Sequence, residues 1–188
     1  MYTASDLRKG LKIEIDGEPY IVTDFDFCKP GKGQALYRCK LKNMLNDTTL
    51  DRTFRSVDKI DKPDLSQKEV FFSYKDGPLY VFMDAETYEE IRIQDTVLGD
   101  QRHFLNGDME CEMLMFQDRA VEVTLPIFVE KKIIKTEPGV RGDTATNVMK
   151  SAWVEGNYEV QVPIFLNEGD VISIDTRTGE YSERVRKA

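Results

Sequence analysis

The sequence from residue 20 to residue 42, YIVTDFDFCKPGKGQALYRCKLK, predicts two strands joined by a loop. Residues 20–27 are rich in β-branched and aromatic side chains, which favour extended structure. After the loop, apolar and basic residues alternate along residues 37–42, as in a strand with one buried face. This alternation places three cations on one face of the second strand: Arg38, Lys40 and Lys42.

The loop between these strands covers residues 29–34 and reads Lys29, Pro30, Gly31, Lys32, Gly33 and Gln34. Proline and glycine favour a turn, and no bulky apolar side chain anchors the segment in a core, so we expect it to protrude with Lys32 at its tip. On the residues alone, the plainest interpretation is a solvated hairpin tip. The alternative is a cationic finger that enters a groove lined by phosphates, because residues 27–46 hold five cations and no acid.

Outside this stretch the sequence also predicts mainly β-structure. Residues 11–15 alternate in polarity before the turn pair Asp16-Gly17, and residues 69–83 form an aromatic-rich hairpin around a second Asp-Gly pair. Residues 109–125 supply two more strands, whereas residues 95–106 favour a helix. The fold class that these patterns indicate is all-β.

The strands fall into three blocks of about 60 residues, which favours three small β-barrels over one sandwich. In the last block we expect strands at residues 129–137, 158–166, 171–175 and 181–187. The polar sequence DKPD at residues 61–64 ends the first block. The expected domains are therefore residues 1–64, 65–128 and 129–188.

The composition is typical of a soluble globular protein, with 188 residues, 40% hydrophobic and 32% charged, and a net charge of −8. No apolar run approaches the ~20 residues that span a bilayer, and the first residues lack a signal-peptide core. We therefore expect a cytoplasmic protein without membrane contact. The net charge is +1 for the first expected domain, −8 for the second and −1 for the third. A local basic stripe that suits phosphate therefore lies in the first domain, and the acidic middle domain should face protein or solvent.

Catalytic and metal-binding patterns are missing from the sequence. The three cysteines have no metal-ligand or disulfide spacing and are interpreted as reduced: Cys28, Cys39 and Cys111. His103 is the single histidine and is interpreted as an ordinary helix or surface residue. The carboxylates Asp84, Glu86, Glu89 and Glu90 are interpreted as a solvated face. We expect no cofactor, no metal and no catalysis by this chain alone.

The segment KPGKGQA at residues 29–35, followed by LYRCKLKN, resembles the loop of the first domain in the bacterial elongation factor P family. The resemblance continues through GDTAT at residues 142–146, VPIFLNEGD at 162–170 and DTRTGEY at 175–181, and it covers essentially the whole chain. Two departures lie near residue 153, in a segment that we expect to be a loop of the third domain. Lys-Ser-Ala stands at 150–152 where the family has Lys-Pro-Ala, and Gly156 follows the glutamate directly.

The resemblance implies an L-shaped mimic of tRNA with an SH3-like (KOW-type) barrel followed by two OB-fold barrels. It implies a translation elongation factor that binds the ribosome, both rRNA and ribosomal proteins, between the peptidyl-tRNA and exit sites. Such a factor stimulates peptide-bond formation at consecutive prolines. The expected partners are the ribosome and peptidyl-tRNA, and the factor is expected to act as a monomer.

The resemblance also implies roles for individual residues. Lys32 would reach the CCA end of the peptidyl-tRNA, and in many family members this position is modified after translation, which adds a lysine-modifying enzyme as a partner. A tip lysine argues against the arginine–rhamnose branch and leaves β-lysylation, aminopentanol attachment and an unmodified lysine open. Six further residues would contact RNA in the third domain: Gly142, Asp143, Thr144, Tyr181, Arg184 and Arg186.

Three other functions remain as alternatives. The first is a paralogue of elongation factor P with a narrower role. The second is a general OB-fold RNA-binding protein, which would stack bases on exposed aromatic side chains. The third is a small-molecule enzyme that uses a carboxylate pair in the middle domain, and its discriminating residues are Glu89 and Glu90.

Overall fold

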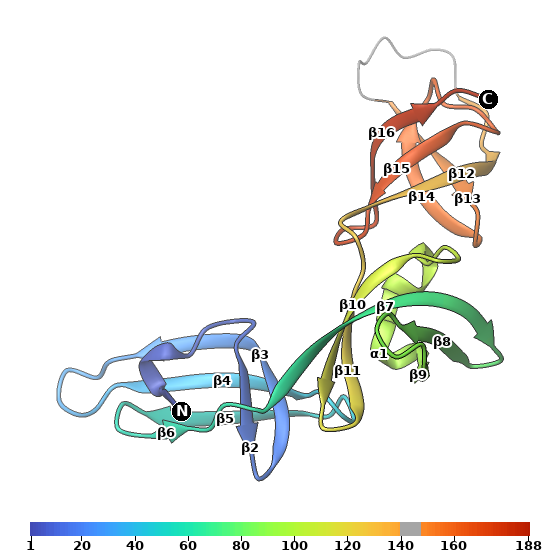
Figure 1. The fold of residues 1–188 in the computed structure, drawn as a ribbon. Coiled ribbons are helices and arrows are strands. Elements are labelled where there is room, and N and C mark those ends of the chain that lie inside the picture. Colours follow the sequence, from blue (N-terminus) through green and yellow to red (C-terminus); the bar gives the residue numbers. More distant parts are fainter. Residues whose placement is uncertain (140–147) are drawn as a thin grey trace. The chain divides into compact units, whose positions relative to one another are not determined.

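The computed structural model describes residues 1–139 and 148–188 and is built almost entirely of antiparallel strands (Figure 1). By internal packing the chain divides into two compact units. The first holds residues 1–68 and 113–122, and the second holds residues 69–112 and 123–188. No helix in the described part of the chain has the length and apolarity that crossing a bilayer requires.

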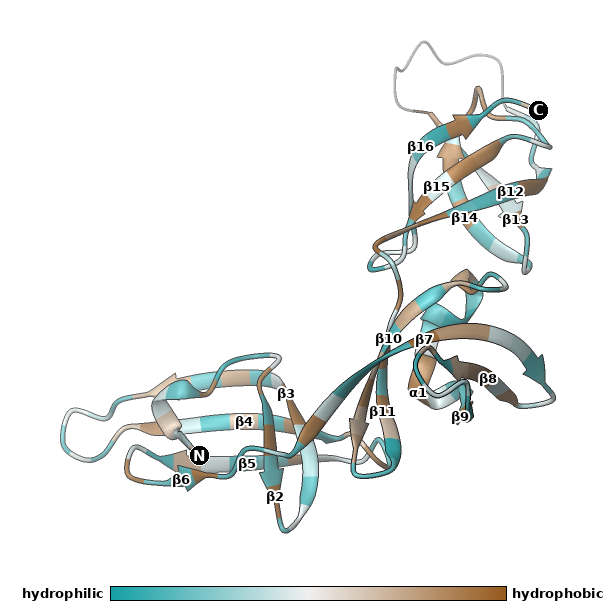
Figure 2. Cartoon of the chain, viewed as in Figure 1, coloured by the Kyte–Doolittle hydropathy of each residue, from teal (hydrophilic) through white to brown (hydrophobic). Residues whose placement is uncertain are grey.

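The N-terminal part carries a four-stranded sheet in the order β2-β3-β4-β5 and a two-stranded sheet of β1 and β6. Its elements are β1 (Tyr2–Thr3), the 3-10 helix η1 (Ala4–Asp6), β2 (Lys12–Ile15), β3 (Glu18–Cys28), β4 (Leu36–Asn43), β5 (Thr49–Arg55) and β6 (Lys59–Ile60). Its core is apolar and includes the fully buried Ile13 and Leu41. In Figure 2 hydrophobic and hydrophilic segments follow one another along these strands, as expected for a sheet with one face in a core.

A five-stranded sheet follows in the order β11-β10-β7-β8-β9. Its elements are β7 (Leu65–Asp76), β8 (Leu79–Asp84), β9 (Glu90–Gln94), α1 (Asp95–Leu98), the 3-10 helix η2 (Gly99–Phe104), β10 (Glu110–Phe116) and β11 (Arg119–Thr124). The helix expected at residues 95–106 is therefore present, although only its first turn is α-helical.

The last sheet has five strands in the order β14-β13-β12-β15-β16. Its strands are β12 (Phe128–Thr136), β13 (Met149–Val154), β14 (Tyr158–Pro163), β15 (Val171–Asp175) and β16 (Glu180–Arg186). This sheet agrees with the strands that the sequence predicts for the last block, with β13 in addition.

Tight turns form where the sequence contains Asp-Gly pairs. Between β2 and β3, Asp16 and Gly17 both have positive φ, 52° and 79°, as a type I′ turn requires. Between β7 and β8 the chain turns at Gly77, which has a φ of 59°. Because glycine adopts this region at no steric cost, these pairs determine where each hairpin reverses.

Within the second unit, polar and aromatic contacts connect residues near η2 to strands β12 and β14. The buried Lys131 ammonium donates to the carbonyl oxygen of Leu105 at 3.2 Å and to Asn106 Oδ1 at 2.6 Å. The rings of Phe104 and Tyr158 meet edge to face with centroids 4.9 Å apart. Burial lowers the pKa of Lys131, because it disfavours the charged ammonium. The two hydrogen bonds compensate for part of this desolvation.

Candidate nucleic-acid interface

The loop between β3 and β4 is exposed along its length. All six residues from Lys29 to Gln34 are exposed, and within the part of the chain that the structure describes no hydrogen bond or ion pair is found for Lys32. Gly33 has a φ of 136°, which residues with side chains rarely adopt, and a Cβ added there would lie 3.7 Å from Pro30 Cγ. The ammonium of Lys32 is therefore available to a partner.

The stem below the loop is a regular antiparallel ladder. The pairing of β3 with β4 runs from Tyr20 opposite Asn43 to Cys28 opposite Leu36, with one irregularity between Val22 and Asp24. This ladder is as long as β4 itself. Antiparallel hydrogen bonds along it fix the direction in which the loop leaves the sheet.

Aromatic side chains pack together at the end of this stem that adjoins the loop. The Phe27 and Tyr37 rings lie opposite each other with centroids 5.0 Å apart, and Phe25 lies 6.1 Å from Tyr37. Aromatic cross-strand pairs each stabilise a hairpin by roughly 0.2–1 kcal/mol relative to alanine pairs. The stem therefore supports the loop with packed rings up to the residue before Cys28.

The basic face of β4 has opposing carboxylates, which corrects the expectation of an uncompensated cationic flank. Asp26 lies directly opposite Arg38, whereas Lys40 has Asp24 on one side and Asp51 on the other. Directly opposite side chains share one face of the sheet with Cβ atoms about 5 Å apart. The two cations are exposed, but phosphate near them would also meet these carboxylates.

Lys42 is further compensated by an ion pair, because its Nζ lies 2.9 Å from Asp47 Oδ1. Residues 27–46 contain no acid, but Asp47 follows them directly. The acids that oppose Arg38 and Lys40 lie on the neighbouring strands β3 and β5. The charged face also borders a groove of about 310 Å³ lined by both signs of charge. Of the five cations in residues 27–46, Lys29 and Lys32 lie in the loop, beyond these acids.

The predicted RNA-binding residues of the last sheet lie on its edge strand. Tyr181 is half-buried on β16, and burial raises its pKa. Arg184 and Arg186 are exposed on the same strand, and the Arg184 guanidinium lies 5.4 Å from the centroid of the Phe165 ring. The other three predicted residues, Gly142, Asp143 and Thr144, lie outside the described residues.

No sequence pattern distinguishes Phe165 from its apolar neighbours. This side chain is 54% exposed in the turn after β14, where it directly precedes the fully buried Leu166. An apolar run of three residues, Ile164 to Leu166, does not reveal which member faces the core. One sequence signal for an exposed side chain in this run was present. Pro163 ends an alternating strand, and the apolar residues 164–166 follow it directly.

The departures near residue 153 do not lie in a loop, as the sequence interpretation placed them, but mostly in strand β13. Ser151 Oγ donates to Glu159 Oε1 at 2.7 Å, and the Lys135 ammonium lies 5.1 Å from the centroid of the Trp153 ring. Only Gly156 is in the turn after the strand, with a φ of 88°. These residues therefore form cross-strand contacts within an ordinary sheet.

The cysteines lie in separate positions and are all free. Cys28 is exposed at the end of β3, and Cys39 is buried on β4 opposite Phe25, where burial raises its pKa. The two thiols therefore do not face each other across the ladder. Burial also raises the pKa of the third thiol, Cys111, to about 12, so it stays protonated at neutral pH and is a poor nucleophile.

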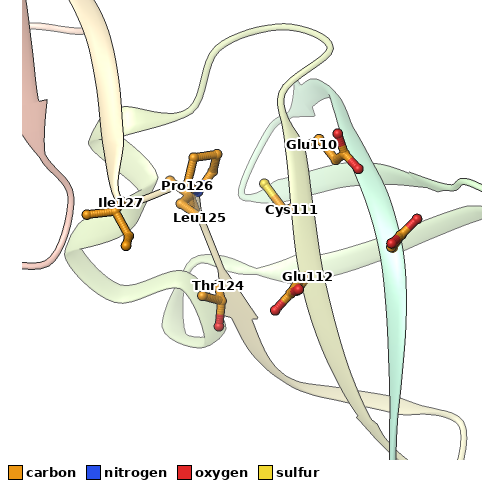
Figure 3. A pocket seen from close by; sticks show the side chains of 8 residues that line it. Glu110, Cys111, Glu112, Thr124, Leu125, Pro126 and Ile127 are labelled. Atoms are coloured by element: carbon orange, nitrogen blue, oxygen red, sulfur yellow. The ribbon is translucent and has the colours of Figure 1, made fainter.

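Cys111 lines a pocket of about 380 Å³ in the second unit (Figure 3). It lies between Glu110 and Glu112 on β10, and the apolar part of the lining includes Leu125 and Pro126. The charge of Glu110 adds to the effect of burial in raising the pKa of this thiol, so the pocket holds no thiolate nucleophile at neutral pH. Among the residues that the structure describes, no group of three or more His, Cys, Asp or Glu side chains could hold a metal ion.

Of the four carboxylates near residue 84, Glu86, Glu89 and Glu90 are exposed as expected, and only Asp84 departs from the solvated face. Asp84 is buried, and its Oδ1 accepts hydrogen bonds from the backbone N–H groups of Glu86 and Thr87, so it stabilises the turn between β8 and β9. Glu90 is exposed and lies 3.3 Å from an Arg92 guanidinium nitrogen. These roles are structural and do not favour an enzyme.

Comparisons with known proteins cover the whole length of the chain. Three family models match: "Elongation factor P (EF-P) KOW-like domain" at residues 3–60, "Elongation factor P (EF-P) OB domain" at 65–123 and "Elongation factor P, C-terminal" at 129–184. The expected fold class, an SH3-like KOW-type domain followed by two OB-fold domains, is thereby confirmed.

Individual relatives agree with the family models. The chain is 48% identical over 187 residues to elongation factor P of Desulfotalea psychrophila, covering 100% of both chains. It is 47% identical over 186 residues to elongation factor P of Syntrophus aciditrophicus, covering 99% of this chain and 100% of the relative. A solved structure, eukaryotic translation initiation factor 5A from Methanococcus jannaschii, has a similar fold, with a TM-score of 0.53 and 21% identity over 66% of this chain and 90% of that one.

Proposed function

Because the chain belongs to the elongation factor P family and is a translation elongation factor, we propose that it binds the ribosome between the peptidyl-tRNA and exit sites. In this position it stimulates peptide-bond formation at consecutive prolines. The Lys32 loop holds the CCA end of the peptidyl-tRNA. Domain boundaries at residues 64/65 and 128/129 are part of this proposal.

The exposed, unpaired Lys32 on a stiff stem is the observation that carries the proposal. A lysine ammonium is a compact charge on a flexible chain, suited to phosphate and ribose oxygens. Its neighbours Gly31 and Gly33 have no side chains, so RNA can approach the backbone closely. The opposing acids of the stem leave Lys29 and Lys32 as the cations best placed for such a contact.

The proposed mechanism is orientation of a slow reactant. Proline is a secondary amine with a fixed φ, so the nascent chain near the reaction centre is constrained and reacts slowly. A factor that holds the peptidyl-tRNA in a productive geometry lowers the barrier, because the reactants lose their freedom of motion on binding and not in the transition state. Such a factor supplies no reacting group. The ribosome therefore performs the chemistry, and this chain does not act as an enzyme.

The proposed position on the ribosome also assigns contacts to the second and third domains. Tyr181, Arg184 and Arg186 contact the small-subunit side, and the loop with Gly142, Asp143 and Thr144 faces the exit-site codon. The acidic middle domain faces protein or solvent, since phosphate would repel it. The factor binds as a monomer in the cytoplasm, without membrane contact, and a lysine-modifying enzyme that extends Lys32 is a further partner.

Translation of a template with consecutive proline codons tests this function. We expect Lys32→Ala to abolish the stimulation while leaving the melting temperature unchanged, since Lys32 is exposed and has no hydrogen bond or ion pair among the described residues. The matched control is Lys62→Ala, which removes an exposed lysine from the same unit and should keep full activity. Full activity of Lys32→Ala would refute the proposal.

Two readouts separate the proposal from its alternatives. A narrower paralogue would relieve stalling on a subset of proline templates only. A general RNA-binding protein would bind arbitrary single strands as tightly as ribosomes. Intact-mass and peptide mass spectrometry of protein from its own host determines whether Lys32 carries an extension.

A further inference from the structure

We propose that Phe165 is a stacking platform for an unpaired RNA base on the ribosome, with Arg184 beside it as the cationic partner of that nucleotide. The inference rests on the proposed function and adds to it a specific contact of the last sheet. It is carried by the exposure of the ring, the rigidity of the turn and the position of the guanidinium.

Phe165 is more exposed than the two apolar residues that follow and precede it in the same turn. The turn after β14 places Leu166 fully in the core, whereas Phe165 is 54% exposed and Ile164 is 42% exposed. Ile164 packs towards Gly139, where an added Cβ would lie 3.5 Å from the Ile164 Cβ. The aromatic ring is therefore the large apolar group of this turn that keeps most of its surface in solvent.

The turn that carries the ring is held at both ends. The Leu166 N–H donates to the Pro163 carbonyl at 3.2 Å, and the Asn167 N–H donates to Asp170 Oδ2 at 3.0 Å. The other oxygen of Asp170 accepts the Ala188 N–H at 2.8 Å, and these backbone hydrogen bonds lower the pKa of Asp170. A ring on such a turn loses little freedom when it binds, which favours affinity.

Cations lie next to the exposed ring. The Arg184 guanidinium is 5.4 Å from the centroid of Phe165, within the range of a cation–π interaction. Besides the two backbone hydrogen bonds described above, the positive charges of Arg184 and Lys187 lower the pKa of Asp170, so both cations lie near the turn. The guanidinium lies over one face of the ring, so the exposed remainder of the ring is the surface on which a base stacks, and the phosphate of that nucleotide meets the cation.

Variants of Phe165 distinguish a base from an apolar protein side chain as the occupant. Phe165→Trp keeps a π face, whereas Phe165→Leu keeps apolar character without one. Stacking on one base predicts that the leucine variant binds programmed ribosomes roughly 5- to 150-fold more weakly, and that the tryptophan variant stays close to wild type. The matched control is Phe128→Leu, since Phe128 is a similarly exposed ring, 52%, on β12 of the same sheet.

The measurement is the equilibrium dissociation constant of each intact variant for ribosomes that carry mRNA and peptidyl-tRNA, together with its melting temperature. A photoreactive side chain at position 164 should cross-link to RNA in the same complex. If wild type binds and Phe165→Leu binds equally well, or if the cross-link goes to protein, the inference is overturned and the proposed function stands. If wild type does not bind ribosomes, the proposed function is wrong and the inference is wrong with it.

Discussion

Neutralising the acids that oppose the basic face of β4 should turn the stem of the Lys32 loop into an unselective RNA-binding surface. The perturbation is the triple variant Asp24→Asn, Asp26→Asn and Asp51→Asn, in which each carboxylate faces Arg38 or Lys40 across the ladder. Asparagine keeps the side-chain oxygen that Asp24 uses to accept the Phe25 N–H at 3.0 Å. Folding is therefore expected to survive the substitution.

The magnitude follows from counting the cations that are released. Two side chains, Arg38 and Lys40, lose their opposing charges, and each can then contact one phosphate. For single-stranded RNA the slope of log affinity against log salt changes by about 0.7 per phosphate, or about 1.4 for two. Between about 50 and 200 mM salt, the affinity of this variant for RNA should therefore fall by a factor roughly seven times larger than that of a variant without the two added contacts.

The assay is fluorescence anisotropy of a labelled single-stranded RNA of mixed sequence, titrated with each variant at several salt concentrations. The matched control is Asp64→Asn, Asp95→Asn and Asp118→Asn, which makes the same change in net charge at exposed sites away from this ladder. Identical salt slopes for the two triple variants would show that the opposing acids do not limit RNA contact at the stem, and the reasoning would be refuted.

Two further predictions concern stability and thiol reactivity. Gly179→Ala should lower the free energy of unfolding by about 2–3 kcal/mol, since Gly179 has a φ of 76° and an added Cβ would collide with the Tyr158 hydroxyl, which donates to its carbonyl; chemical denaturation measures this, with Gly107→Ala, at an open site, as the near-neutral control. At pH 8 a thiol reagent should label one cysteine of the native protein, Cys28, since it is exposed while Cys111 is buried with its pKa raised to about 12; labelling of Cys111 at the rate of Cys28 would contradict this.

Local features of the fold were predictable from the sequence because their causes are local. Asp16-Gly17 predicts a tight hairpin turn through the backbone freedom of two adjacent residues, and the alternation after residue 36 predicts which side chains of β4 are buried. The exposed loop at residues 29–34 was predictable for the same reason, since it contains no side chain that a core could bury.

The electrostatics of the site were not predictable, because they depend on strand register. The acids opposite Arg38 and Lys40 come from β3 and β5, and pairing across strands is not visible in a window of neighbouring residues. The same limit applies to Phe165, whose cation lies on β16, 19 residues further along the chain. Spacing along the sequence does not show that two such residues meet.

In the part of the chain that the structure describes, the Lys32 side chain is exposed and has no hydrogen bond or ion pair, which has a consequence for how variants of this protein should be screened. The core residues of the first domain and the exposed tip, which we propose to contact the peptidyl-tRNA, occupy separate positions, so we expect changes at the tip to leave the melting curve unchanged. A library sorted by heat resistance or expression level would keep inactive tip variants alongside active ones.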